Sequence, residues 1–177
     1  MPILYDVTNR AAGPETAALG AFQTGTPRDR PAIVLPQPPD GGWLEVEFAF
    51  QAQIQNVVFP QSRGIWSQHA TECAIVGVAY RENHTWVRAS MVHVPGGNPH
   101  ADFVRNWPDL TQNMPNRKAR YGVVAFSRRY IPKDFDETLV KHVMEMEIDN
   151  LIVYVANWGV VTLGISNAGN WGEDPRP

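Results

Sequence analysis

The sequence predicts an α+β fold of mainly antiparallel β-structure: a β-sandwich or mixed sheet of about seven strands with one long helix packed on it. Short apolar or alternating runs are separated by turn residues, which is typical of strands. A single segment near the C-terminus has helical periodicity. Strands and helices do not alternate along the chain, which argues against a parallel βαβ sheet. At 177 residues, the chain is long enough to bury a substantial core.

The chain divides by composition at residue 42. Residues 1–42 contain seven of the fifteen prolines and show no helical or strand periodicity. We interpret them as an extended lead-in rich in Pro and Gly, and residues 43–177 as a single catalytic or binding domain.

Two strands are expected directly after the lead-in. Residues 43–50 alternate, so one face of that strand should be buried. Its apolar side chains are Leu44, Val46, Phe48 and Phe50. A second strand is predicted over residues 54–59 and ends at Pro60, and residues 61–72 are expected to form a polar loop.

A β-hairpin is the strongest local prediction. Two strand-like runs, residues 73–80 and 85–94, flank a tight polar turn at residues 81–84. An odd number of loop residues would place Cys73 directly opposite His93, with Cβ atoms about 4.5 to 5.5 Å apart. An even loop would send the imidazole to the other face of the sheet, because side chains alternate with period two.

The C-terminal part of the domain supplies the remaining elements. Residues 95–119 lack periodicity and are expected to form a long functional loop. A strand is predicted over residues 120–127. Two more, over residues 151–156 and 160–165, are expected to pair as a hairpin around the three-residue loop 157–159.

One long helix is predicted between these strands, from Asp134 to Asn150. Asp134 is a suitable N-cap, and Glu137 stands three residues later as a capping-box partner. An apolar stripe follows at helical spacing, formed by Phe135, Leu139, Val140, Val143, Met144 and Met146.

Charge and cysteine usage narrow the function classes. A net charge of -3 argues against a general nucleic-acid-binding protein. A stretch without acidic residues is nevertheless basic, and it is read either as a solvated sheet edge or as a docking surface for an acidic partner. Its basic residues are Arg117, Lys118, Arg120, Arg128, Arg129 and Lys133. The only cysteine, Cys73, excludes an internal disulfide.

No membrane-spanning or targeting segment is recognised in the sequence. An apolar run of about 18 or more residues is missing, and the N-terminus lacks the basic and apolar regions of a secretory signal. We therefore expect a protein without a membrane partner, which acts in the cytoplasm or is delivered into the cytosol of a target cell.

Cys73 and His93 are the candidate catalytic pair, because both stand at strand ends beside irregular segments. This pattern resembles the superfamily of the cytotoxic necrotizing factor catalytic domain, the chemoreceptor glutamine deamidases and a lethal-factor-like deamidase. Those proteins have a Cys that begins a strand and a His on the following strand. A hydroxyl residue six positions before the Cys orients the His in some members, and that position is Ser67 here. The resemblance covers residues 67–97.

The resemblance implies a cysteine-dependent glutamine deamidase that acts on a protein substrate, as a toxin or effector does, and that needs no cofactor. Cys73 would be the nucleophile and His93 the general base. Ser67 is the first choice for orienting His93, with Thr71 and Asp102 as alternatives. With a primary amine in place of water, the same site would transamidate, and both outcomes remain open.

Two other functions compete with the deamidase. A zinc site is possible in principle from His69, Cys73, His93 and His100, although their spacing matches no common zinc motif. The alternative function is a non-enzymatic β-sandwich binding module that uses exposed indoles. The tryptophans available to it are Trp43, Trp66, Trp86, Trp107, Trp158 and Trp171.

Overall fold

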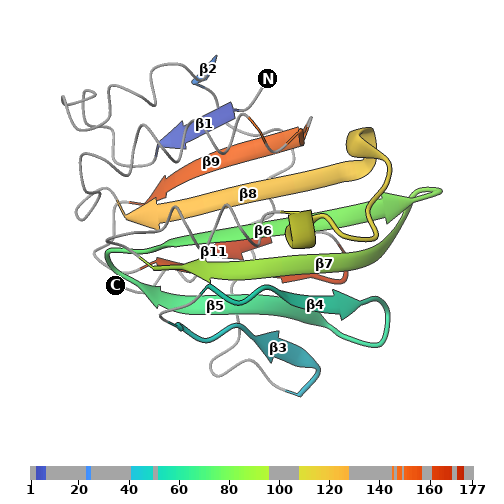
Figure 1. Ribbon diagram of the computed structural model, residues 1–177, viewed down its shortest axis with the longest axis horizontal. Coiled ribbons are helices and arrows are strands. Elements are labelled where there is room, and N and C mark those ends of the chain that lie inside the picture. Colours follow the sequence, from blue (N-terminus) through green and yellow to red (C-terminus); the bar gives the residue numbers. More distant parts are fainter. Residues whose placement is uncertain are drawn as a thin grey trace.

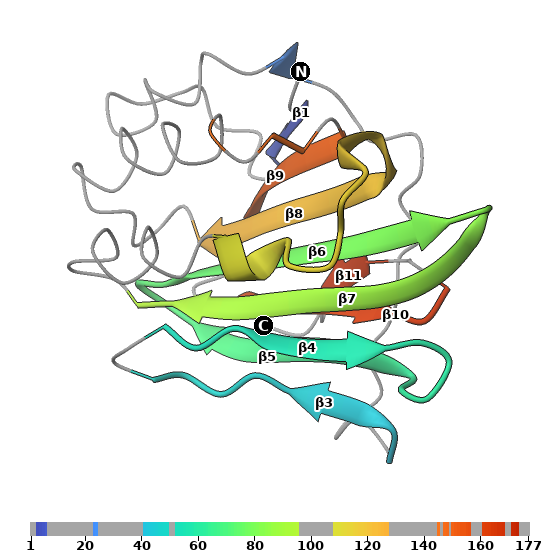
Figure 2. The same ribbon diagram turned by 45° about the vertical axis from the view of Figure 1, so that its right-hand side comes forward.

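The fold consists of two mixed β-sheets packed face to face (Figures 1 and 2). A computed structural model describes residues 3–6, 23–24, 41–49, 52–95, 108–127, 145, 147–148, 150–156, 161–168 and 171–173. These residues are mostly β-strand, and they contain no helix of seven or more residues. None of the described helical segments is long and apolar enough to cross a membrane.

The larger sheet has seven strands in the order β2-β1-β9-β8-β6-β7-β4. Its strands are β1 (Ile3–Asp6), β2 (Gln23–Thr24), β4 (Gln55–Val58), β6 (Ala74–Glu82), β7 (Thr85–Val94), β8 (Arg120–Ser127) and β9 (Asn150–Ala156). The pairs among β4, β7, β6 and β8 are antiparallel, and those among β8, β9, β1 and β2 are parallel. Part of the segment expected to be a lead-in, residues 3–6 and 23–24, thus joins this sheet.

The smaller sheet has four strands in the order β11-β10-β5-β3. Its strands are β3 (Trp43–Glu45), β5 (Gly64–Ala70), β10 (Val161–Ser166) and β11 (Trp171–Glu173). β3 runs parallel to β5, and the other pairs are antiparallel. Because β3 and β4 are the last strands of their sheets on the same side, the described strands leave one edge of the sandwich open (Figure 1).

The main core lies between the two sheets. Side chains of the larger sheet, including Ile75, Met91 and Tyr154, pack against Ile65 and Ile165 of the smaller one. The sheets approach closely at the centre of β6. A Cβ added at Gly77 would lie 2.6 Å from Cδ1 of Ile165, so any larger residue would force that side chain to shift.

A second core covers the other face of the larger sheet. Alternate residues of the central strands, among them Val76 and Val124, are buried there. Leu110 and Met114 cover them from the segment that the sequence analysis expected to be a long loop. This segment ends in the short 3-10 helix η2 (Arg117–Ala119). Burial on both faces explains why β6 and β7 are apolar on both sides.

The β6–β7 hairpin closes through a two-residue turn, Asn83-His84. Both residues have positive φ, 45° and 67°, as a type I′ turn requires. The loop is therefore even, contrary to the odd loop that the catalytic hypothesis favoured. With an uninterrupted ladder, this turn would have placed Val92 opposite Ile75.

A bulge in β7 shifts the register by one residue and so cancels the effect of the even loop on the position of His93. Tyr80 pairs with Arg88 and Arg81 with Trp86, so Val87 is one extra residue on β7. Beyond the bulge, His93 pairs with Ile75. The imidazole is thereby returned to the face that looks toward the smaller sheet.

The predicted helix over residues 134–150 is wrong within the part of the chain that the structure describes. Glu145 alone has helical backbone, Glu147 has a positive φ of 50°, and Asn150 already begins β9. A left-handed residue cannot continue a right-handed helix, and the strand after it takes the last predicted turn. Residues 134–144 lie outside the described residues. The α+β class is corrected to a mostly β fold of two mixed sheets.

Three strand predictions also need correction. The expected polar loop over residues 61–72 contains β5, a strand with neighbours on both sides in the smaller sheet. The strand expected over residues 43–50 is paired only as β3, and Phe48 beyond it is 48% exposed. The hairpin expected around residues 157–159 is wrong, because β9 and β10 belong to different sheets.

Candidate functional site

The candidate site lies between the sheets at the end where β6 begins and β7 ends. Ser67 of β5 and His93 of β7 face each other across the two sheets, with Ser67 Oγ 3.0 Å from His93 Nδ1. Ser67 is 0% exposed and His93 is 1% exposed. Ser67 Oγ also donates a hydrogen bond of 2.6 Å to the backbone carbonyl of Val46.

These two hydrogen bonds determine the tautomer of His93. A serine hydroxyl has one proton, and the short bond to the Val46 carbonyl uses it because a carbonyl oxygen can only accept. Ser67 Oγ must therefore accept from His93, which places the imidazole proton on Nδ1. The lone pair of the neutral ring is then on Nε2, where a general base needs it.

His93 is neutral near pH 7. Burial, and to a smaller extent the charge of nearby His69, lowers the pKa of His93 from 6.5 to about 4. Nε2 is buried and has no hydrogen-bond partner in the part of the molecule that the structure describes. An unpaired acceptor in such a place is costly, which is a common property of functional sites.

Cys73 lies immediately before β6 and is half-buried. Its side chain packs against the core between the sheets, the same core that contains Ile75. Because Ile75 pairs with His93, Cys73 is two residues along the strand from the position directly opposite the imidazole. The expected direct pairing is thus wrong by two residues, but the thiol and the imidazole share one face. Diagonal neighbours of this kind have Cα atoms about 7 to 8 Å apart.

A second bulge lies beside this pair, in β5. Ser67 pairs with Leu163 and Ala70 with Val161, so two residues of β5 stand against one of β10. One of them, His69, has a left-handed backbone with φ 60°. Bulges often re-aim side chains next to functional sites. Sequence analysis treated His69 only as a possible zinc ligand, and nothing in the local residues signals the bulge.

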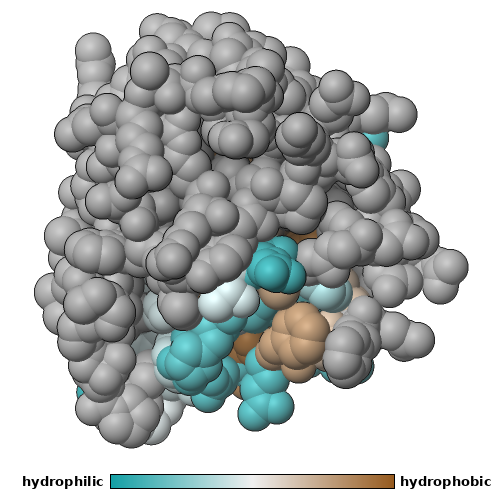
Figure 3. Space-filling model, turned by 90° about the vertical axis from the view of Figure 1, so that its left-hand side faces the viewer, coloured by the Kyte–Doolittle hydropathy of each residue, from teal (hydrophilic) through white to brown (hydrophobic). Residues whose placement is uncertain are grey.

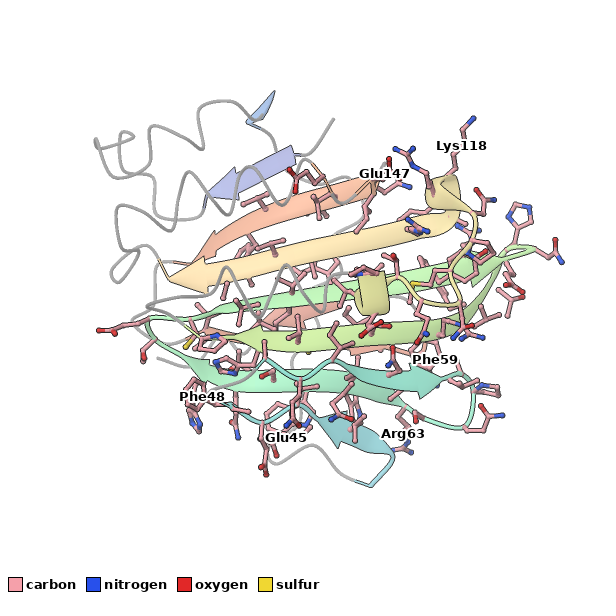
Figure 4. The ribbon with its side chains drawn as sticks, in the orientation of Figure 1. Glu45, Phe48, Phe59, Arg63, Lys118 and Glu147 are labelled. Carbon is pink, nitrogen blue, oxygen red and sulfur yellow. The ribbon has the colours of Figure 1, made fainter. Side chains whose placement is uncertain are left out.

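Phe48 covers the imidazole from the side of the open edge. Its ring meets that of His93 edge-on, with centroids 5.4 Å apart and planes at 76°. Figure 4 shows Phe48 and Glu45 along this edge, with Phe48 nearer the end at which β5 finishes. In a view onto that end, hydrophilic side chains of the described residues border a smaller apolar area (Figure 3).

The other predicted site residues are placed as follows. Thr71 is exposed between β5 and β6, whereas Ser67 makes the contact with His93. Asp102 and His100 lie outside the described residues. No group of three or more His, Cys, Asp or Glu side chains among the described residues is arranged to hold a metal ion.

The tryptophans proposed for a binding module are mostly packed. Trp66 and Trp171 are buried, each 7% exposed, and Trp43 and Trp86 are half-buried. Trp86 stacks edge-on against Tyr121. Trp107 and Trp158 lie outside the described residues. Among the four described indoles, two are therefore buried in the core and two are half-buried.

Comparison with known proteins finds no matching family model and no matching curated sequence. The chemistry of the site therefore has to be argued from its residues.

Proposed function

We propose that this chain is a cysteine-dependent protein glutamine deamidase, with Cys73 as nucleophile, His93 as general base and Ser67 as the residue that orients the base. The protein substrate would be met in the cytosol, either of the producing cell or of a target cell. The proposal is supported above all by the buried hydrogen bond between Ser67 and His93 Nδ1. It leaves Nε2 as the basic atom, on the face that Cys73 shares.

The reaction begins with proton transfer from the Cys73 thiol to Nε2 of His93. The thiolate attacks the carboxamide carbon of a substrate glutamine and forms a tetrahedral intermediate. The backbone N–H of Cys73 and a neighbouring loop N–H stabilise the oxyanion, with each donor typically worth about 2.7 to 4 kcal/mol. The imidazolium returns its proton to the leaving nitrogen, ammonia departs and a thioester remains.

Water completes the reaction. Nε2 of His93 takes a proton from water, the hydroxide attacks the thioester carbonyl, and the proton returns to the sulfur. The net change is glutamine and water to glutamate and ammonia. At a pKa of about 4, the His93 ring is unprotonated at neutral pH but is a weak base, so the cycle requires its pKa to rise when the Cys73 thiolate forms beside it. The Cys73–His93 hydrogen bond has to close when substrate binds, as catalytic contacts often do.

The test is a search for one chemical change in a protein mixture. The protein and its Cys73→Ala variant are incubated separately with a cell lysate, and peptides are screened by mass spectrometry for glutamines that gain about one dalton. We expect sites modified only by the native protein. His93→Gln should lower the rate about 100-fold or more, as loss of a general base does. Identical peptide maps for native protein and Cys73→Ala would overturn the proposal.

A further inference from the structure

A groove runs along the open edge of the sandwich, next to the candidate site. It is lined by residues 44–49, which continue from β3, and by Gln53 and Gln55 at the start of β4. Its volume is about 270 Å³. That space suits a few side chains of an extended segment, and is small for a drug-sized ligand.

The wall of the groove is connected to His93 by two contacts. The carbonyl of Val46 accepts from Ser67, which in turn accepts from the imidazole. The ring of Phe48 lies against the ring of His93, and Phe48 is 48% exposed. Behind this wall, the buried Nε2 of His93 lacks a partner among the described residues. A segment bound in the groove would therefore lie beside the wall that contacts His93.

Among the described residues that line the groove, the charge is negative. Glu45 and Glu47 are the ionisable ones, and both are exposed. Gln68 donates a hydrogen bond of 2.9 Å to Glu45 Oε1, but a neutral amide leaves the carboxylate charge in place. Phe48 also lines the groove and is exposed, and aromatic rings attract cations. These features favour a cation and disfavour an acidic segment.

We propose that this groove binds a positively charged segment of the protein substrate, so that a glutamine flanked by Lys or Arg is presented to Cys73. This inference rests on the proposed deamidase function and names its substrate class. The carboxylates of Glu45 and Glu47 bind the Lys or Arg residues beside the glutamine, and Phe48 contacts the side chains of those residues. The site is therefore selective for basic sequences.

Binding is tested separately from turnover, with the inactive Cys73→Ala protein. Three fluorescent peptides share a central glutamine and differ in two flanking residues, which are Lys, Ala or Glu. Fluorescence anisotropy should show the Lys peptide binding about 10-fold more tightly than the Ala peptide, at about threefold per exposed charge pair, and the Glu peptide binding more weakly than either. Raising the salt concentration should reduce this difference.

Glu47→Gln in the same background should weaken binding of the Lys peptide about threefold and leave the Ala peptide unchanged. Glu82→Gln is the matched control, since it removes the same charge at the exposed hairpin end of β6. Equal binding of the three peptides, or equal effects of the two substitutions, would overturn the groove assignment. Selective binding without any deamidation by the native protein would overturn the deamidase proposal alone. Deamidation without a preference for basic peptides would overturn the groove assignment alone.

Discussion

A histidine with a left-handed backbone lies near each end of the β6–β7 ladder, and the surroundings of the two histidines differ. At the hairpin end, His84 (φ 67°) is exposed, and its Nδ1 lies 3.1 Å from an Arg81 nitrogen. At the other end, His69 (φ 60°) on the adjacent β5 lies close enough to His93 to lower its pKa. The same unusual conformation thus serves a turn in one place and borders a buried polar site in the other. A left-handed backbone alone therefore does not single out a site, and what distinguishes the His69 end is the buried, unpaired Nε2 of His93 beside it.

The largest expected difference between the two ends is in how their histidines change the stability of the protein at acidic pH. The pKa of His93 is 6.5 in the unfolded chain and about 4 in the fold, so the unfolded state binds more protons between these values. The contribution of neutral His93 to the free energy of unfolding is complete above pH 6.5. It is lost as the pH drops through 4, by about 3 kcal/mol in total. Urea unfolding at pH 7, 6, 5 and 4 measures this loss.

The variant His93→Gln should lose this part of the pH dependence, whereas the exposed His84→Gln should retain it. The hypothesis of a buried, neutral His93 would be rejected if both variants followed the native curve.

The next largest effect is expected from replacing a buried serine, and it distinguishes Ser67 from Ser90. Ser67→Ala removes the acceptor of the His93 Nδ1 proton and should cost about 1 to 3 kcal/mol. Ser90→Ala is the control, because Ser90 is 1% exposed and its Oγ bonds to Asn56 Oδ1, on the larger sheet. Unfolding measurements should give similar losses for both variants. Deamidation should fall only for Ser67→Ala, and Ser67→Thr should restore part of it; equal activity losses would contradict an orienting role.

The smallest effect compares the two left-handed histidines directly. His69→Gly and His84→Gly should each stabilise the protein by about 0.5 to 1 kcal/mol, because glycine adopts positive φ without a steric cost. Only His69→Gly should also raise the pKa of His93, since it removes a nearby positive charge. An NMR titration of the His93 ring measures this shift. The distinction between the two ends would fail if His84→Gly moved that titration as well.

Much of the sheet was predictable from residue patterns. The strands around Val76, Val92 and Val124 are largely apolar on both faces, which is typical of strands buried on both sides. β5 was missed because Ser67, Gln68 and His69 give it the composition of a loop. Its Ser67 and Gln68 side chains are instead hydrogen-bonded to partners distant in sequence, which are Val46 and Glu45 beside β5 in the smaller sheet and His93 across the sandwich.

The site was predictable in part. Ser67 and His93 were expected to meet on the strength of a family resemblance, and they are in hydrogen-bond contact; their catalytic role stays a prediction. The offset of Cys73 from His93 depends on the bulge at Val87, which no local pattern signals. The helix was predicted from apolar residues at helical spacing, with its end at Asn150. In the structure Asn150 is a strand residue that pairs with Tyr121. Tertiary pairing overrides local propensity there.

The hydrogen bond between Ser67 and His93 bridges the two sheets, because β5 belongs to one and β7 to the other. Any shear of one layer over the other must lengthen this bond, and the apolar contacts around it tolerate sliding better than a directional bond does. The same bond holds the imidazole proton on Nδ1, so its loss would remove the constraint on which ring nitrogen carries that proton.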